Sequence, residues 1–296
     1  MSGEREPTSS DEVDYYAPES IPAAQRRLAD TDGFVKVLAG GQTLSLLLGQ
    51  GLLDADALVD VGDIPSLSGV TAEDERAEIG AATTYAALRE SALTDRIGAL
   101  ADACSVVGDR QVRTMGTVGG AVRHADPALD VVAVFQALDA TLTVGSIAGR
   151  RTAPIDDFLV SHMRTDLDDE ELLESITVDV PGAQTGTAYE KHAAVETTWA
   201  TVGAAAWLTV ESGTIIDARV ALTAVADTAV RSPVVEAALV GEPAAQESLA
   251  AASEEVVEDI DPIDDGAASA AYKRKLAPTI VERSLVRSLE RAGDSS

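Results

Sequence analysis

The sequence predicts an α+β protein with two or more domains. Its 296 residues are enough for about one to three domains, and hydrophobic residues make up 46% of them, which is sufficient for substantial cores. Strand and helix candidates are interspersed up to Pro181, where the segment 181–186 has the proline, glycine and small polar residues of a linker. Beyond it, three strand candidates precede the helices, and this order indicates a separate α+β domain.

Before the linker, we expect a disordered acidic lead at 1–13 and a turn at 15–20. Ser20 is a candidate helix N-cap, and Pro22 stands near the first helical position. The remaining elements expected here are helices at 23–29, 44–51, 85–90, 97–106 and 128–138, and strands at 34–38, 57–61, 67–70, 77–79, 141–144, 150–153 and 176–180.

After the linker, the pattern predicts a strand meander and then helices. The strands are expected at 187–191, 200–210 and 215–223. A short helix is expected at 234–239, an acidic helix at 244–260 and a long helix at 268–291, with Pro278 as a breaker in the last one.

The charge is strongly negative. Fifty acids against 22 bases give a net charge of −28, and only four of the bases are lysines. Such a surface repels nucleic acid and anionic lipid, so we expect no nucleic-acid partner. Because the acids are spread along the chain, we interpret the composition as adaptation of a folded protein to a salt-rich cytoplasm rather than as an acidic tail for a partner.

Cysteine use and hydropathy narrow the function further. Cys104 is the only cysteine, which excludes disulfide scaffolds and iron–sulfur ligation within this sequence. We interpret Cys104 as a small buried residue in a helix. No uninterrupted apolar run is long enough for a membrane span, and no basic segment followed by an apolar stretch is visible at the start. We therefore expect a cytoplasmic protein.

Two glycine pairs suggest a phosphate ligand. One lies in Ala39-Gly40-Gly41-Gln42-Thr43, after the first strand, and the other in Thr117-Val118-Gly119-Gly120. Glycine pairs let backbone N–H groups point into one concavity, and a following helix start adds a favourable dipole. Each pair alone can equally be a tight strand-to-helix turn, and neither matches the dinucleotide fingerprint G-x-G-x-x-G.

The residues flanking the second pair leave several roles open. Arg110 and Arg113 precede it, and either could neutralise a phosphate or form a salt bridge with one of the many acids. Asp130 could bind ribose hydroxyls or an adenine amine, or could be a helix N-terminal acid stabilised by the dipole. His124 and Asp126 could shape a site or serve as structural and turn residues.

Longer motifs around these turns resemble the FAD-binding medium subunits of the molybdenum hydroxylases, a family that includes xanthine dehydrogenase and aerobic carbon monoxide dehydrogenase. The motifs are Ala39–Thr43, Leu58–Val61 with Ile64–Val70, Ile79–Thr84, the segment Gln111–Asp130, Tyr189–Lys191, Val202-Gly203 and Tyr272–Leu276. The resemblance runs from Tyr15 to about Arg291. Thr114 and Thr43 are mild departures, standing where asparagine and serine are common.

The resemblance implies a fold and a domain plan. The expected fold is a two-subdomain FAD-binding fold of the p-cresol-methylhydroxylase or vanillyl-alcohol-oxidase type. Residues 14–182 would form it, with subdomains at about 14–66 and 67–182. Residues 187–291 would form a C-terminal α+β domain with a small antiparallel sheet and helices.

The resemblance also implies the cofactor site, with FAD as the cofactor and no catalytic base or metal ligand. Asp130 matches the acid that binds the adenosine half, Leu173 an apolar residue near the flavin, and Lys191 a flavin-site lysine. The residues expected to hold the diphosphate or line the site are Val37, Leu38, Ala39, Gly40, Gly41, Gln42, Thr43, Leu44, Thr117, Val118, Gly119, Gly120, His124 and Asp126.

In that family, substrate is oxidised at a molybdenum cofactor in a large subunit. Electrons pass through a small subunit with two iron–sulfur clusters to FAD, and then to NAD, a quinone or another acceptor. These two subunits are the implied partners, and a dimer of such heterotrimers is one assembly that the resemblance allows. Two alternatives stay open: a flavin-free assembly subunit of the same complex, and a free-standing flavoprotein oxidase.

The acid excess predicts a salt requirement. Removing salt lengthens the Debye length from about 3 Å at 1 M to about 10 Å at 0.1 M, so repulsion among the acids grows. We expect far-UV circular dichroism to show loss of structure on dialysis from multi-molar to low salt. An unchanged spectrum would contradict the salt-adaptation interpretation.

Overall fold

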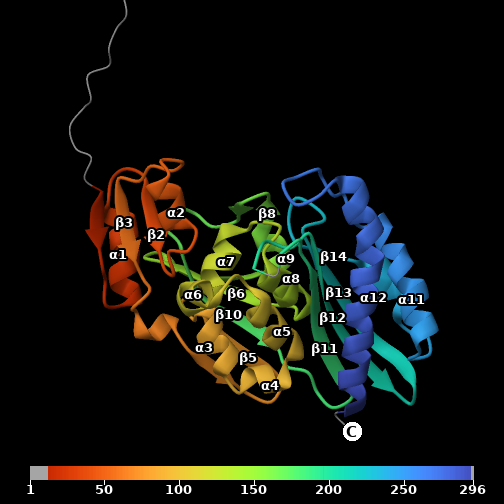
Figure 1. The fold of residues 1–296 in the computed structure, drawn as a ribbon. Helices are drawn as coiled ribbons and strands as arrows, with labels where there is room; N and C mark the ends of the chain where they lie inside the picture. The colour runs from red at the N-terminus through yellow and green to blue at the C-terminus, as the bar shows by residue number, and fades with distance from the viewer. Residues whose placement is uncertain (1–12, 196, 295–296) are drawn as a thin grey trace, which may run out of the picture.

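The computed structural model describes residues 13–195 and 197–294. Three regions follow one another along the chain, each with its own sheet (Figure 1). Helices and sheets occur together throughout, so the predicted α+β class is confirmed. The predicted disordered lead lies outside the described residues, apart from Val13.

The first region is a small parallel sheet with two helices. The strand order is β1-β3-β2, and the first hydrophobic core lies between this sheet and α1. The prediction of a turn at 15–20 is wrong at its start, because Tyr15 and Tyr16 pair with Leu58 and Val59 in a parallel ladder. The elements are β1 (Asp14–Tyr16), α1 (Ile21–Asp30), β2 (Val35–Leu38), α2 (Leu44–Gly49) and β3 (Ala57–Asp60).

The second region carries a five-stranded sheet, order β4-β5-β10-β6-β7, and most of the largest core. It begins with a 3₁₀ turn at Pro65–Leu67. Its strands are β4 (Val70–Ala72), β5 (Arg76–Gly80), β6 (Thr141–Ser146), β7 (Gly149–Pro154), β8 (Leu159–Ser161), β9 (Arg164–Thr165) and β10 (Leu172–Asp179). Its helices are α3 (Tyr85–Glu90), α4 (Leu93–Arg96), α5 (Gly98–Val106), α6 (Arg110–Met115), α7 (Val118–His124), α8 (Asp130–Ala137) and α9 (Ile155–Phe158).

Two predictions for this region need correction. The expected strand at 67–70 is instead the end of a 3₁₀ turn followed by β4, because Pro65 lacks an N–H and starts a tight turn. The Gly119-Gly120 pair lies inside the first turn of α7 and not in a loop before it. Cys104 is fully buried in α5 as expected, and burial raises the pKa of its thiol to about 12.

The C-terminal region is an antiparallel sheet, order β11-β12-β13-β14, with three helices. The predicted meander is confirmed, and the short edge strand β14 was not expected. The elements are β11 (Thr185–His192), β12 (Val202–Glu211), β13 (Thr214–Thr223), β14 (Val230–Arg231), α10 (Pro233–Leu239), α11 (Gln246–Glu254), the 3₁₀ turn Glu255–Glu258 and α12 (Ala270–Asp294).

Both faces of this sheet are buried. Along β12, Ala205 and Trp207 join the core of the second region, while Ala204 and Ala206 join the core beneath the C-terminal helices. Figure 1 shows the sheet between α5 and α8 on one side and α11 and α12 on the other. A strand buried on both faces is apolar throughout, which explains why β12 shows no alternation of polar and apolar residues.

The two long C-terminal helix predictions also need correction. The expected acidic helix at 244–260 is the helix α11 followed by a 3₁₀ turn. Pro278 does not break α12, which continues through it. Its neighbours Ala277, Ile280 and Val281 are buried against the sheet, and this packing outweighs the loss of one backbone hydrogen bond.

Gly186 lets α12 lie directly on β11. A Cβ at this position would collide with the carbonyl oxygen of Ser288 and lie 2.6 Å from the amide nitrogen of Ala292. We predict that Gly186→Ala lowers the free energy of unfolding by about 1–3 kcal/mol through overpacking.

The control is Gly182→Ala in the linker, where a Cβ meets nothing within 4 Å. It should change the free energy of unfolding by less than about 0.5 kcal/mol. Denaturant unfolding in high salt measures both, and equal effects would show that α12 does not depend on this close approach.

Candidate functional site

The first glycine turn connects β2 to α2 and lies against the residues before α7. Gly41 has a φ of 69°, in the left-handed region that favours glycine. A Cβ on Gly40 would collide with the carbonyl oxygen of Met115 and lie 2.8 Å from the Cα of Gly116. The first glycine turn is therefore in close contact with the backbone directly before the second glycine pair.

The N–H groups of this turn are open. In the part of the chain that the structure describes, the backbone N–H groups of Gly40, Gly41, Gln42 and Thr43 donate to no protein acceptor. The side-chain amide of Gln42 donates back to the Gly40 carbonyl oxygen at 3.3 Å. Successive free N–H groups in a turn form a concavity suited to an anion, so these residues fit a phosphate group.

The amides of the second glycine pair are already bonded within the protein. Val118 N–H donates to the Thr83 carbonyl oxygen at 3.0 Å, Gly119 N–H to that of Ala81 at 2.9 Å, and Gly120 N–H to the Thr117 hydroxyl at 3.2 Å. The expectation that these amides are open donors is wrong. A Cβ on Gly119 would lie 2.5 Å from the Cβ of Ala81, so Gly119 is required for packing.

The remaining predicted residues of the first turn surround it. Val37 and Ala39 pack against the first core, and Leu38 and Leu44 are half-buried beside them. Thr43 precedes α2 and makes no side-chain capping bond.

The predicted residues at the C-terminal end of α7 do not all point to a ligand. His124 is the last residue of α7, and burial lowers its pKa. Asp126 is a turn residue whose Oδ1 accepts from the Ala128 N–H at 2.8 Å. Leu173 is buried in β10, where the ladder to β6 has a register shift.

Asp130 and Lys191 lie together between the second and C-terminal regions. Asp130 is the first residue of α8, and Lys191 lies on β11. The Lys191 ammonium donates to Asp130 Oδ2 at 2.9 Å and to the Val106 carbonyl oxygen at 3.2 Å. The Tyr189 hydroxyl donates to Asp130 Oδ1 at 2.6 Å. Both carboxylate oxygens of Asp130 are thus bonded within the protein.

This cluster is strongly desolvated. Asp130 is only 5% exposed, and burial raises the pKa of its carboxyl, while Lys191 and Tyr189 act in the opposite direction. Burial also raises the pKa of the Tyr189 hydroxyl, so it remains a donor. The predicted role of Asp130 at the adenosine half would have to use lone pairs that these two partners leave free.

Comparison with known proteins decides the family. The family model described as the FAD binding domain in molybdopterin dehydrogenase matches residues 11–181, and the CO dehydrogenase flavoprotein C-terminal domain matches residues 187–288. The chain belongs to the FAD-binding subunits of molybdenum hydroxylase-type dehydrogenases.

Relatives of this FAD-binding subunit resemble it along nearly their whole length. The carbon monoxide dehydrogenase medium chain of Hydrogenophaga pseudoflava is 33% identical over 92% of this chain and 95% of its own. The 6-hydroxypseudooxynicotine dehydrogenase complex subunit alpha of Paenarthrobacter nicotinovorans is 32% identical over 94% and 95%. A solved carbon monoxide dehydrogenase from H. pseudoflava superposes with a TM-score of 0.91 at 34% identity, covering 96% of this chain and 99% of that one.

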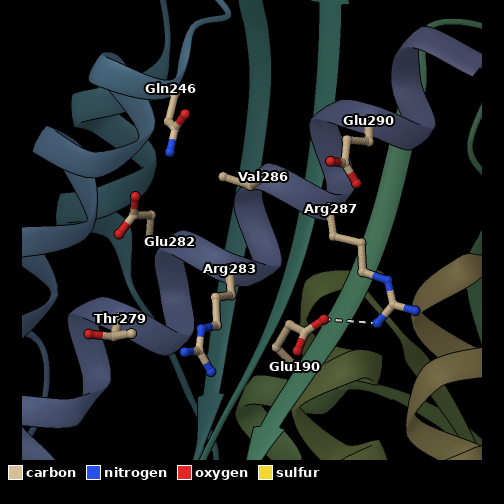
Figure 2. Close-up of a pocket in the computed structure, with 8 residues that line it drawn as sticks. All are labelled: Glu190, Gln246, Thr279, Glu282, Arg283, Val286, Arg287 and Glu290. Carbon is tan, nitrogen blue, oxygen red and sulfur yellow. Dashed lines mark hydrogen bonds and ion pairs between the residues drawn. The ribbon is translucent and has the colours of Figure 1, made fainter.

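A surface hollow on the C-terminal helices of this FAD-binding subunit lies away from the glycine turns. Figure 2 shows it beside α12, with Glu190, Glu282 and Glu290 near Arg283 and Arg287. Arg287 bonds Glu190 at 2.8 Å. Figure 1 places α12 at the opposite side of the molecule from β2 and α2. These side chains carry charges of both signs, and nothing in the hollow points to a ligand, so we assign it none.

Sequence reasoning gave no separate role to Tyr189, whose hydroxyl donates to Asp130. Tyr189 and Lys191 are two residues apart on a strand, so their side chains lie on the same face. This spacing could have predicted that Tyr189 lies beside Lys191. Arg113, by contrast, forms no salt bridge among the described residues. Its guanidinium donates to the carbonyl oxygens of Val107 and Gly108.

The Asp130–Lys191 ion pair supports a prediction about stability. Lys191→Met leaves a buried carboxylate without its cation, which typically costs about 3–5 kcal/mol of unfolding free energy. The exposed Lys275 provides the control, since Lys275→Met should cost less than about 0.5 kcal/mol.

The pH dependence of this loss has a definite sign. Removing Lys191 raises the folded-state pKa of Asp130 further, so the folded variant binds a proton that the unfolded chain releases at lower pH. The deficit relative to the unmodified protein should therefore shrink as the pH falls through that raised pKa. A pH-independent deficit in denaturant unfolding would show that the ion pair does not cause it.

Proposed function

We propose that this chain binds FAD and uses it to relay electrons within a molybdenum-dependent dehydrogenase complex. Electrons would arrive from an iron–sulfur subunit and leave to an external acceptor such as NAD or a quinone, after substrate oxidation on a molybdenum-containing large subunit. The observation that carries the cofactor assignment is the row of open N–H groups at Gly40–Thr43, in a chain whose residues 11–181 match an FAD-binding family.

The residues present suit the diphosphate of FAD. The amides of the first turn would donate to its oxygens, and the close contact of Gly40 with Met115 and Gly116 holds this turn beside the start of α7. The flavin itself supplies the electron-transfer chemistry when bound, while the protein supplies binding, orientation and electrostatics.

The chain's own composition supports a division of labour with other subunits. It has one cysteine, buried in α5, so iron–sulfur clusters would have to be held elsewhere. Among the described residues, no group of three or more potential metal ligands is found, and no helix is long and apolar enough to cross a membrane. The relatives named above are a medium chain and a complex subunit.

Buried ionic bonds would support the flavin end of the site. Lys191, predicted to lie near the flavin, is held by Asp130 and by the Val106 carbonyl oxygen. Its charge is therefore held in position before any ligand binds. A charge held in this way can stabilise charge on a cofactor without rearrangement of the protein.

The proposal predicts tight FAD uptake in high salt. Purified protein should show the visible absorbance bands of oxidised flavin, or acquire them when FAD is added to a colourless preparation. At a free FAD concentration one hundred times the dissociation constant, binding should stabilise the fold by about 2.7 kcal/mol, measurable by thermal unfolding.

Riboflavin is the matched control, because it carries the flavin without the diphosphate and adenosine. It should bind far more weakly than FAD. A folded protein that takes up no FAD would contradict the proposal and favour the flavin-free alternative. With the partner subunits present, substrate should bleach the flavin bands, and flavin that substrate cannot reduce would contradict the relay.

A further inference from the structure

Lys36 lies on the face of β2 that turns away from the first core. Val35 and Val37 pack into that core, so the side chain between them emerges on the opposite face. The Lys36 ammonium sits over the Phe34 ring, 4.0 Å from its centre. Within residues 13–195 and 197–294, it makes no ion pair and donates no hydrogen bond to a protein acceptor.

Arg123 lies on the exposed face of α7. It follows Gly120 by three residues, and residues at this spacing share one face of a helix. Its half-buried side chain lines a hollow together with Met163 and Arg164 of the β8–β9 hairpin. In the described part of the chain, its guanidinium has neither an ion pair nor a hydrogen bond to a protein group.

These two cations are electrostatically coupled. Burial lowers the pKa of both, and the charge of Arg123 lowers the pKa of Lys36 further. Asp169 acts in the opposite direction on both, yet it forms a direct ion pair with neither in the described structure. Two partly desolvated like charges without a direct ion-pair partner are unfavourable, and an anion bound between them would relieve this.

The two elements that carry these cations meet at the open amides. β2 leads directly into the first glycine turn, and α7 begins beside it, because Gly40 packs on Met115 and Gly116. The amides of Val118, Gly119 and Gly120 at the start of α7 are already bonded within the protein, so cationic side chains would add donors to phosphate on this side of the site. Neither Arg110, which is exposed, nor Arg113, which holds a loop, supplies it.

We propose that Lys36 and Arg123 bind the diphosphate of FAD from opposite sides, completing the site begun by the amides of Gly40–Thr43. This rests on the proposed function and adds two residues to it. A guanidinium suits this task because it presents several donors in a plane to phosphate oxygens, and an ammonium adds a point charge.

The experiment is equilibrium binding of FAD to the full chain in high salt. Arg123→Gln and Lys36→Gln should each weaken FAD binding by about tenfold or more, since each removes a charge-assisted hydrogen bond. Arg123→Lys should recover part of the loss. Arg164→Gln, which removes the same charge from an exposed side chain of the same hollow, should change the affinity less than twofold.

A second probe distinguishes the diphosphate from other contacts. Riboflavin lacks phosphate, so its binding should be unaffected by Arg123→Gln and Lys36→Gln. If the variants weakened the binding of riboflavin and FAD equally, or if both left the affinity for FAD unchanged, this inference would be overturned. The proposal that the chain binds FAD would still stand. If the unmodified protein bound inorganic phosphate but not FAD, the proposed function would be overturned as well. Circular dichroism establishes that each variant is folded.

Discussion

The contact between the first glycine turn and the residues before α7 is the constraint on which the site depends. Gly40 has no room for a Cβ because the Met115 carbonyl oxygen occupies that position. This contact sets Gly40 of the first region against Met115 of the second, 75 positions later in the sequence. The strand β2, which carries Lys36, ends just before this contact, and α7, which carries Arg123, begins just after it.

A second set of contacts joins the FAD-binding part to the C-terminal sheet. Arg291 of α12 bonds both carboxylate oxygens of Asp102, at 2.7 and 2.9 Å, and the Ala99 N–H donates to the Thr187 hydroxyl. Together with the Asp130–Lys191 pair, these bonds fix α5 and α8 on one face of the sheet. The Asp130–Lys191 pair is buried, whereas Arg291 keeps about a third of its side chain exposed, so the two ion pairs join the regions in different environments.

Much of the fold could be predicted from local pattern, and the failures have physical causes. The longer strands and α5 follow from apolar runs bounded by glycine and proline, and the meander from its spacing, whereas the short strands β1 and β14 were not predicted. The role of Gly119 could not be predicted, because whether an amide is open depends on what packs against it, here Ala81 and Thr83. The predicted break at Pro278 is wrong for the same reason, since the tertiary burial of its neighbours decides whether the helix continues.

The scarcity of lysine carries more information than the charge excess itself. Of four lysines, Lys191 and Lys273 are buried in ion pairs with Asp130 and Asp265, and only Lys275 is fully at the surface. A chain with so few ammonium groups keeps them where a carboxylate needs a partner. Lys36 departs from this pattern, because it is half-buried and no carboxylate is in direct contact with it, although the charge of Arg123 lowers its pKa and that of Asp169 raises it. In a protein with 50 acids, a partner could readily have been an aspartate or glutamate. Its absence within the described structure is most simply explained when the partner is an anion that the protein does not itself supply.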